Sequence, residues 1–222
     1  MDYGMSTRLE AGNASSSMQP RCTWAQSAPD YLAYHDEEWG RPVSEDRQVF
    51  ERLCLEGFQS GLSWITILRK RAAFRRAFCD FDPSAVASLE EAEIATLVSD
   101  SSIIRHRGKI LATICNARAT LRLQSSGRTL AGVCWSYEPP PAPAPTMGSK
   151  IPASTSGSAA LARELKALGF IFVGPVTAYS LMQSLGVVDD HLADCSIRPL
   201  VEVQRGKFVR PKSPQLVARP ES

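Results

Sequence analysis

The chain has 222 residues, a length that allows one sizeable domain or two small lobes around a core, and its hydrophobic content of 44% fits a soluble globular protein. Its net charge of +2 and isoelectric point near 8.2 permit nucleic-acid binding without indicating it, because charge must be clustered to attract a polyanion. No apolar run approaches the length of a membrane span, and the six cysteines, without a signal-peptide pattern, do not indicate a disulfide framework.

The first and last parts of the chain differ in composition from the middle. Residues 1–20 lack an apolar segment and contain Asp2 and Glu10, which disfavours a targeting peptide and predicts a disordered extension. Residues 200–222 are basic and proline-containing and are expected to form a flexible tail. The folded domain is therefore expected over residues 21–199.

Apolar side chains in the first half of this domain recur at helical spacing. Ser44 is the expected N-cap of a helix that contains Leu53, and Ser63 is the expected N-cap of a second helix running to about Phe78. Asp82 and the proline after it predict a helix start. The segment 88–91 has the pattern of a capping box for the next helix.

The second half continues the helical pattern around one interruption. A helix is expected from Gly108 to about Leu123, and a proline-rich linker is expected over residues 138–152. Ser156 or Ser158 is expected to open another helix, and a further helix follows Gly174. Strand signals are nearly absent, which predicts an all-α fold.

Two pairs of cysteine and histidine, far apart in the sequence, have the composition of one metal site. The first pair is Cys22 and His35, and the second is His191 and Cys195. The i, i+4 spacing of the second pair would place both side chains on one face of a helical turn. Two thiolates and two imidazoles suit a closed tetrahedral zinc site, although spacing alone leaves open that the pairs are unrelated.

The segments around the first pair belong to a longer ordered series. The series comprises Cys22–Trp24, Tyr31–Gly40, Leu53–Ile65, Ile103–Ile110 and Gly169–Gly174. In this order, it resembles DNA-3-methyladenine glycosylase I, an alkylation-repair family of the helix-hairpin-helix superfamily. The resemblance runs from about Arg21 to about Cys195. It implies a helix-hairpin-helix glycosylase fold whose N- and C-terminal segments are joined by one structural zinc, with all four Cys and His residues as ligands.

The resemblance also implies the reaction and the residues that recognise its substrate. The family hydrolyses the N-glycosidic bond of N3-methyladenine, and a lesion inside a duplex must be flipped into a pocket to be reached. Trp64, Trp24 and Tyr34 are expected to line that pocket, because aromatic faces stabilise a cationic base. Glu56 is expected to supply a carboxylate to the base and to act in catalysis. For Trp39 we expect core packing.

The segment after Phe172 resembles the second half of a helix-hairpin-helix motif. Gly174 and Thr177 are expected to contact DNA phosphates independently of sequence, although an ordinary helical hairpin would have a similar pattern. No lysine stands at the hairpin position expected of a bifunctional glycosylase/lyase, so a monofunctional hydrolase is expected. Its expected partner is double-stranded DNA, and the protein is expected to be a monomer without membrane association. Its expected location is intracellular, which means the cytoplasm in a bacterium and the nucleus or an organelle in a eukaryote.

Asp189 departs from the asparagine that is usual in this family. It is expected to cap a helix beside the metal ligand His191, and an electrostatic role in catalysis is the alternative. Two other functions remain open on the sequence. One is an inactive, zinc-stapled DNA-binding protein that keeps the fold, and the other is a relative with an altered lesion preference.

Overall fold

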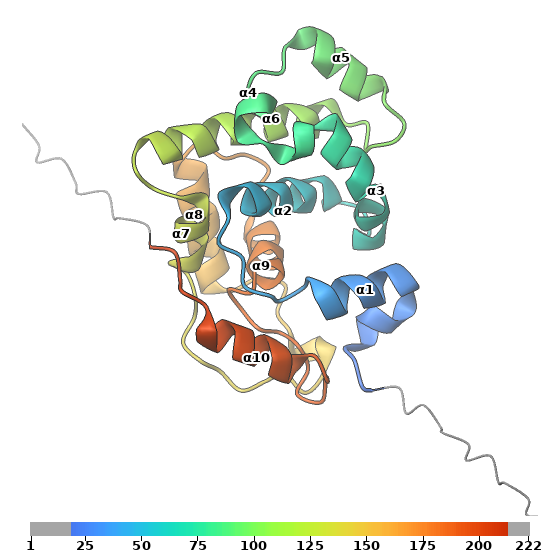
Figure 1. Ribbon diagram of the computed structural model, residues 1–222, viewed down its shortest axis with the longest axis vertical. Coiled ribbons are helices and arrows are strands. Elements are labelled where there is room, and N and C mark those ends of the chain that lie inside the picture. Colours follow the sequence, from blue (N-terminus) through green and yellow to red (C-terminus); the bar gives the residue numbers. More distant parts are fainter. Residues whose placement is uncertain (1–18, 213–222) are drawn as a thin grey trace, which may run out of the picture.

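The computed structural model describes residues 19–212, and within this range all regular structure is helical (Figure 1). The all-α prediction is therefore confirmed for the described part of the chain. The elements in chain order are η1 (Thr23–Ser27), α1 (Pro29–Glu37), α2 (Asp46–Gln59), α3 (Trp64–Ala77), η2 (Cys79–Phe81), α4 (Pro83–Ala87), α5 (Glu91–Ser99), α6 (Arg107–Ser125), α7 (Leu130–Trp135), η3 (Gly148–Lys150), α8 (Ser156–Ala167), α9 (Pro175–Ser184) and α10 (Arg198–Lys207).

Helix α2 runs through the centre of the molecule and contacts α3, α6, α7 and α9 (Figure 1). Its buried face includes Phe50, Leu53 and Phe58, and the Phe58 ring lies 4.6 Å from that of Phe74 on α3. Burying an aromatic or leucine side chain stabilises the fold by roughly 1.5–3 kcal/mol. This apolar core fixes the end of α2, which carries Glu56 in its last turn.

Two of the expected helix starts differ from the structure. Helix α2 begins after Glu45 rather than Ser44, and the capping box of α5 is formed by Glu90 and Glu93. Ser88 is unavailable to cap α5, because it ends α4 and its hydroxyl donates to the carbonyl of Ala85. The expectation of a capping box over residues 88–91 is therefore wrong in register.

The other helix starts lie where the sequence places them. Asp82 caps α4 by accepting a hydrogen bond from the Ala85 amide at 2.9 Å. Ser63 precedes α3 and Gly174 precedes α9. The proline-rich segment forms no regular helix before η3, and its Pro145 carbonyl accepts a hydrogen bond from Ala193 at 2.8 Å.

The expectation of a flexible tail from residue 200 is wrong for residues 200–207, which belong to α10. Val201 is fully buried in a small apolar cluster with Cys22, Cys195 and neighbouring residues. Arg205 pairs with Glu138 at 2.9 Å, and the Phe208 ring packs on Trp135. Arg205 and Arg210, two of the basic residues that suggested a solvated tail, are thus paired with Glu138. The rest of the expected tail, from residue 213, and residues 1–18 of the expected extension lie outside the described residues.

No helix within residues 19–212 is both long enough and apolar enough to cross a membrane.

Candidate active site and metal-binding junction

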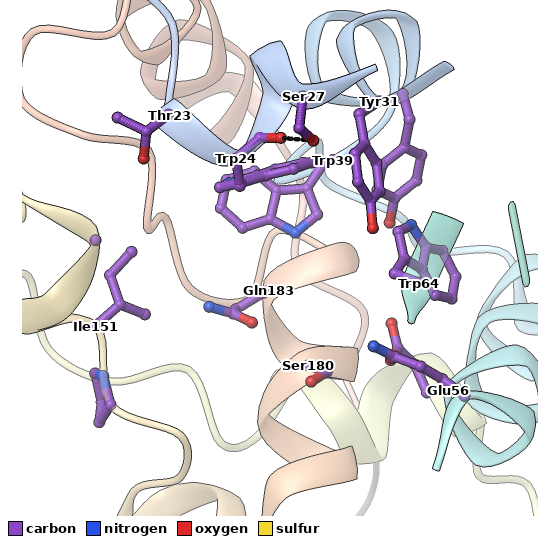
Figure 2. A pocket seen from close by; sticks show the side chains of 14 residues that line it. Thr23, Trp24, Ser27, Tyr31, Trp39, Glu56, Trp64, Ile151, Ser180 and Gln183 are labelled. Atoms are coloured by element: carbon purple, nitrogen blue, oxygen red, sulfur yellow. Dashed lines mark hydrogen bonds between the residues drawn. The ribbon is translucent and has the colours of Figure 1, made fainter. Parts of the chain in front are cut away.

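A pocket of about 540 Å³ opens between α1, α2, α3, α9 and the segment around η3 (Figure 2). Its wall is mostly aromatic, with one carboxylate and a few neutral polar groups. The aromatic and acidic lining residues are Trp24, Tyr31, Tyr34, Trp39, Glu56 and Trp64. The structure thus brings together all four residues expected in a base-binding pocket. A pocket of this size accommodates a nucleobase, and its wall offers flat apolar faces on which such a ring can stack.

Glu56 is the only acidic residue in this lining, and its side chain is almost fully buried, at 6% exposure. Its carboxylate accepts no hydrogen bond from any residue in the described range. Burial raises the pKa of Glu56 to about 8, and the positive charge of Arg52 one turn earlier opposes the rise. A buried, unpaired carboxyl group is costly to ionise, so this site favours a ligand that brings positive charge or hydrogen-bond donors.

Trp64 is the first residue of α3, and its ring lies 5.4 Å from that of Tyr34. In Figure 2 the side chains of Trp64 and Glu56 lie close together on one side of the pocket. The Trp64 Nε1 atom is buried and has no hydrogen-bond partner in the described part of the chain. The Trp64 ring and the Glu56 carboxyl group therefore line the same cavity.

The backbone behind Trp64 is held by Tyr31, a residue for which the sequence indicates no specific role. Its hydroxyl accepts a hydrogen bond from the Ile65 amide at 2.9 Å, while its ring lines the pocket. The first turn of a helix has free amides, and this bond satisfies one of them. Tyr31 therefore connects α1 to the start of α3.

Two tryptophans form a wall shared by the pocket and the cysteine–histidine junction. Trp24 lies 5.2 Å from Trp39 and 5.3 Å from His35, measured between ring centroids. Trp39 is 8% exposed and packs on His191 at 4.7 Å, yet it also lines the pocket. The expectation that Trp39 serves only core packing is therefore incomplete.

The lining also has a neutral polar part that no pattern in the sequence predicts. Gln59 comes from the end of α2. Ser180 and Gln183 come from α9 (Figure 2). Gln183 donates to Asp190 at 2.8 Å, which orients its amide. The spacing of Ser180 and Gln183 places them on one helix face, but no signal in the sequence marks that face as a cavity wall rather than an outer surface.

Cys22, His35 and Cys195 lie together at the junction of the N- and C-terminal segments. One ligand atom from each lies within 4.8 Å of the others, and all three residues are buried. The Cys195 Sγ atom is 3.5 Å from the Nε2 atom of His35. Two thiols and an imidazole at this separation are donors suited to a transition metal such as zinc.

His191 lies beside this group of three, with its ring centroid 4.9 Å from that of His35. Its Nδ1 atom is 2.9 Å from an Asp189 oxygen, and the Nδ1 atom of His35 is likewise 2.7 Å from an Asp36 oxygen. The Nε2 atom of His191 is buried and has no partner among residues 19–212. A carboxylate on Nδ1 with Nε2 left over is the usual arrangement around a metal-bound histidine.

The segment from His191 to Cys195 forms turns rather than the expected helical turn. The Asp189 carboxylate accepts from the His191 amide at 3.2 Å and pairs with Arg198 at 3.8 Å. Because no helix begins there, the expected N-cap role of Asp189 is wrong, and Asp189 does not line the pocket. It positions the His191 ring instead.

The turn between α8 and α9 exposes an apolar tip. Ile171, Phe172 and Val176 are each at least 41% exposed, and Phe172 has a positive φ of 56°. Gly174 and Thr177 are partly exposed at the start of α9. The same helix carries Ser180 and Gln183 toward the pocket (Figure 2), so one rigid element connects the turn to the cavity.

These features define a helical protein with a base-sized pocket next to a cysteine–histidine junction. Residues 24–198 match the family model for methyladenine glycosylase, and the chain belongs to this family. It is 48% identical over 182 residues to DNA-3-methyladenine glycosylase 1 of Escherichia coli (strain K12). The aligned residues cover 81% of this chain and 97% of the relative. It is 42% identical to DNA-3-methyladenine glycosylase of Haemophilus influenzae, covering 80% of this chain and 97% of the relative.

Solved structures agree with the sequence relatives. The fold is similar to a crystal structure of 3-methyladenine DNA glycosylase I, with a TM-score of 0.77, 46% identity and coverage of 80% of this chain and 98% of the other. It is also similar to a variant of such an enzyme in complex with 3-methyladenine, with a TM-score of 0.76, 34% identity and coverage of 80% and 97%. The predicted family is therefore confirmed.

Proposed function

We propose that this protein is a monofunctional DNA-3-methyladenine glycosylase that hydrolyses the N-glycosidic bond of N3-methyladenine and so starts base excision repair. Relatives at 42% and 48% identity over most of the chain have this activity by name. The observation that carries the proposal within the structure is the buried, unpaired carboxyl group of Glu56 beside the Trp64 ring in a base-sized cavity.

The pocket favours a cationic base over a neutral one. Trp64, Tyr34 and Trp24 offer aromatic faces, each able to stabilise a desolvated cation by roughly 0.5–2 kcal/mol. Glu56 ionises when the positive ring arrives, since the pair removes the penalty of an isolated buried charge. Unmodified adenine is neutral and gains less from both contributions, so flipping it into the pocket is less well compensated.

Bond cleavage then needs little acid catalysis. The alkylated base leaves as a neutral molecule, so the pocket need not supply a strong general acid. The remaining tasks are to hold the base, to stabilise the positive charge that develops on the sugar and to admit water. Glu56 is the residue we assign to the electrostatic part, because it is the only carboxylate lining this cavity.

Double-stranded DNA is the substrate form, bound without sequence preference by a monomer. We assign Gly174 and Thr177 to phosphate contacts, because they lie partly exposed at the N-terminus of α9, where backbone amides face outward. The α8–α9 hairpin would then be the helix-hairpin-helix element. Phosphate contacts carry no base information, which suits an enzyme that searches all sequences for damage.

One zinc ion, held by Cys22, His35, His191 and Cys195, would join the two ends of the domain. The support is the donor set, the unpartnered Nε2 atom of His191 and the carboxylate on each Nδ1 atom. The ion would supply folding energy rather than chemistry, since four protein ligands leave no open coordination position.

Incubation with methylated duplex DNA, followed by chromatography of released bases, tests the function. We expect free 3-methyladenine from the wild type and a strongly reduced yield from Glu56→Gln. A wild type that binds the duplex and releases no base would indicate the inactive DNA-binding protein instead. A panel of other alkylated bases separates this activity from an altered lesion preference.

A further inference from the structure

The turn between α2 and α3 sets the relative placement of the two principal base-binding residues. Glu56 stands in the last turn of α2 and Trp64 opens α3, so residues 60–63 are the chain connection between the two helices that carry them. Gly61 has a φ of +82°, a conformation that side-chain-bearing residues seldom adopt. The Leu62 amide donates to Gln59 at 2.6 Å within the turn.

A lysine from another helix donates hydrogen bonds to the backbone of this turn. Lys109 of α6 is 7% exposed, and its ammonium group donates to the carbonyls of Phe58 at 2.8 Å and Ser60 at 2.7 Å. Carbonyls at a helix end lack partners within the helix and carry partial negative charge. An ammonium group satisfies both carbonyls with charge-assisted bonds that hold the end of α2 in one conformation.

The backbone of Lys109 is fixed as well. The Lys109 amide donates to the Nδ1 atom of His106, which caps the first turn of α6. Lys109 does not line the pocket, so it does not touch a bound base. Its influence on the pocket therefore passes through the backbone of the α2–α3 turn.

We propose that Lys109 is a positioning residue for base excision: its two bonds to the α2–α3 turn set the placement of Glu56 relative to Trp64. The proposal rests on the glycosylase function proposed above. A misplacement of about 1 Å at a reacting group can lower a rate on the order of 100-fold. A flexible turn would therefore weaken excision without touching the surface that holds the duplex.

Lys70 provides a matched control for the test. It also donates from its ammonium group to two backbone carbonyls, Ser101 at 3.0 Å and Ser102 at 2.9 Å, but on a loop that does not line the pocket. We would compare wild type with Lys109→Met, Lys109→Gln, Lys109→Arg and Lys70→Met. The measurements are single-turnover excision, undamaged-duplex affinity, melting temperature and amide hydrogen exchange of residues 59–65.

We expect Lys109→Met to slow excision at least about tenfold at a temperature well below its melting point, with duplex affinity within about twofold of wild type. Exchange at residues 59–65 should rise in this variant. Lys109→Arg, which retains charge and two donors, should recover most of the rate, and Lys70→Met should match the wild type in excision and in exchange at residues 59–65.

Other outcomes are equally decisive. Excision at the wild-type rate in Lys109→Met, or in Lys109→Gln if the Met variant does not fold, would overturn the proposal. A parallel loss of duplex affinity and excision, without recovery in Lys109→Arg, would also overturn it and assign Lys109 to general stability. A wild type that releases no base contradicts the proposed function instead, and hydrogen exchange still shows whether Lys109 holds the turn.

Discussion

The pocket and the cysteine–histidine junction share a wall of two tryptophans but satisfy their polar groups in opposite ways. At the junction, the Nδ1 atoms of both histidines are bonded to carboxylates, and one buried ligand atom is left over. In the pocket, the Glu56 carboxylate has no hydrogen bond from the described residues, and neither has Trp64 Nε1. The unpaired Nε2 atom of His191 is buried at the junction, whereas the Glu56 carboxyl group lines a cavity of about 540 Å³.

This difference separates a site that completes the fold from a site that awaits a ligand. Loss of a junction group should mainly lower stability, because a buried polar group that loses a partner still bears the free-energy cost of desolvation. Loss of a pocket group should mainly lower excision, and for Glu56 it should raise stability. The four predictions below test this contrast, from the largest expected effect to the smallest.

Replacing Cys195 by Ala should remove a metal ligand and lower the free energy of unfolding by several kcal/mol, because a structural zinc contributes folding energy directly. Cys134→Ala is the matched control, since Cys134 is also a buried thiol but lies in the main core. That control should lose only about 1 kcal/mol, the approximate free energy of a small cavity. Metal content and denaturant unfolding of both variants would check this, and equal losses would contradict a metal at the junction.

Glu56 should make stability and excision respond to pH in opposite directions. Because burial raises its pKa from 4.5 to about 8, the folded protein binds a proton between these values that the unfolded chain releases. The free energy of unfolding should therefore fall as pH rises through this window, by up to about 1.4 kcal/mol per unit. Excision of the cationic base should rise over the same range as the carboxylate forms.

Glu56→Gln should remove both dependences and be the more stable protein near pH 8. Glu45→Gln, at the start of α2, is the control and should keep the wild-type behaviour. Unfolding curves and single-turnover excision at several pH values measure the two effects. A Glu56→Gln variant that is less stable than wild type at pH 8 would make Glu56 a structural partner rather than a pocket carboxylate.

Trp64→Ala should slow excision of N3-methyladenine by about 5- to 150-fold, which corresponds to the roughly 1–3 kcal/mol of one base–aromatic stack. Binding to an undamaged duplex should remain nearly unchanged, because the ring lines the pocket. Trp64→Phe keeps a stacking face and should lose less. If both variants instead melted early and lost duplex binding in parallel, Trp64 would be a core residue.

The sequence predicted those parts of the molecule that depend on residue type and short spacing. Apolar periodicity located the helices, and the family motifs brought Glu56 and Trp64 into one pocket. Residue type, spacing and the family motifs also singled out Cys22, His35 and Cys195, which lie together in the structure, although the turn between His191 and Cys195 was not predicted. An i, i+4 spacing suggests a helix, but the Asp189 carboxylate competes by accepting the His191 amide at 3.2 Å.

Residues whose role depends on a distant partner could not be found in this way. Lys109 and the carbonyls it binds are about 50 residues apart, so nothing local distinguishes it from a solvated lysine. Helix α10 was taken for a tail because its basic residues suggest solvent. The structure shows that Arg205 and Arg198 instead donate to backbone carbonyls of the irregular segment 186–191. Such long-range contacts are visible only once the chain is folded.

The smallest expected effect concerns this arginine support of the junction. Arg198 donates to the carbonyl of His191 at 2.6 Å and to that of Asp189 at 3.2 Å. Arg198→Met should lower the free energy of unfolding by about 1–2 kcal/mol, because two carbonyls and a carboxylate lose a charged donor. It should also let a chelator remove the metal faster, since His191 is then held less firmly. Arg210→Met is the control, because Arg210 binds Glu138 and does not contact the junction. If a chelator removed the metal at the same rate in both variants, α10 would stabilise the fold without positioning His191. The groups that stabilise the junction would then be limited to the four proposed ligands.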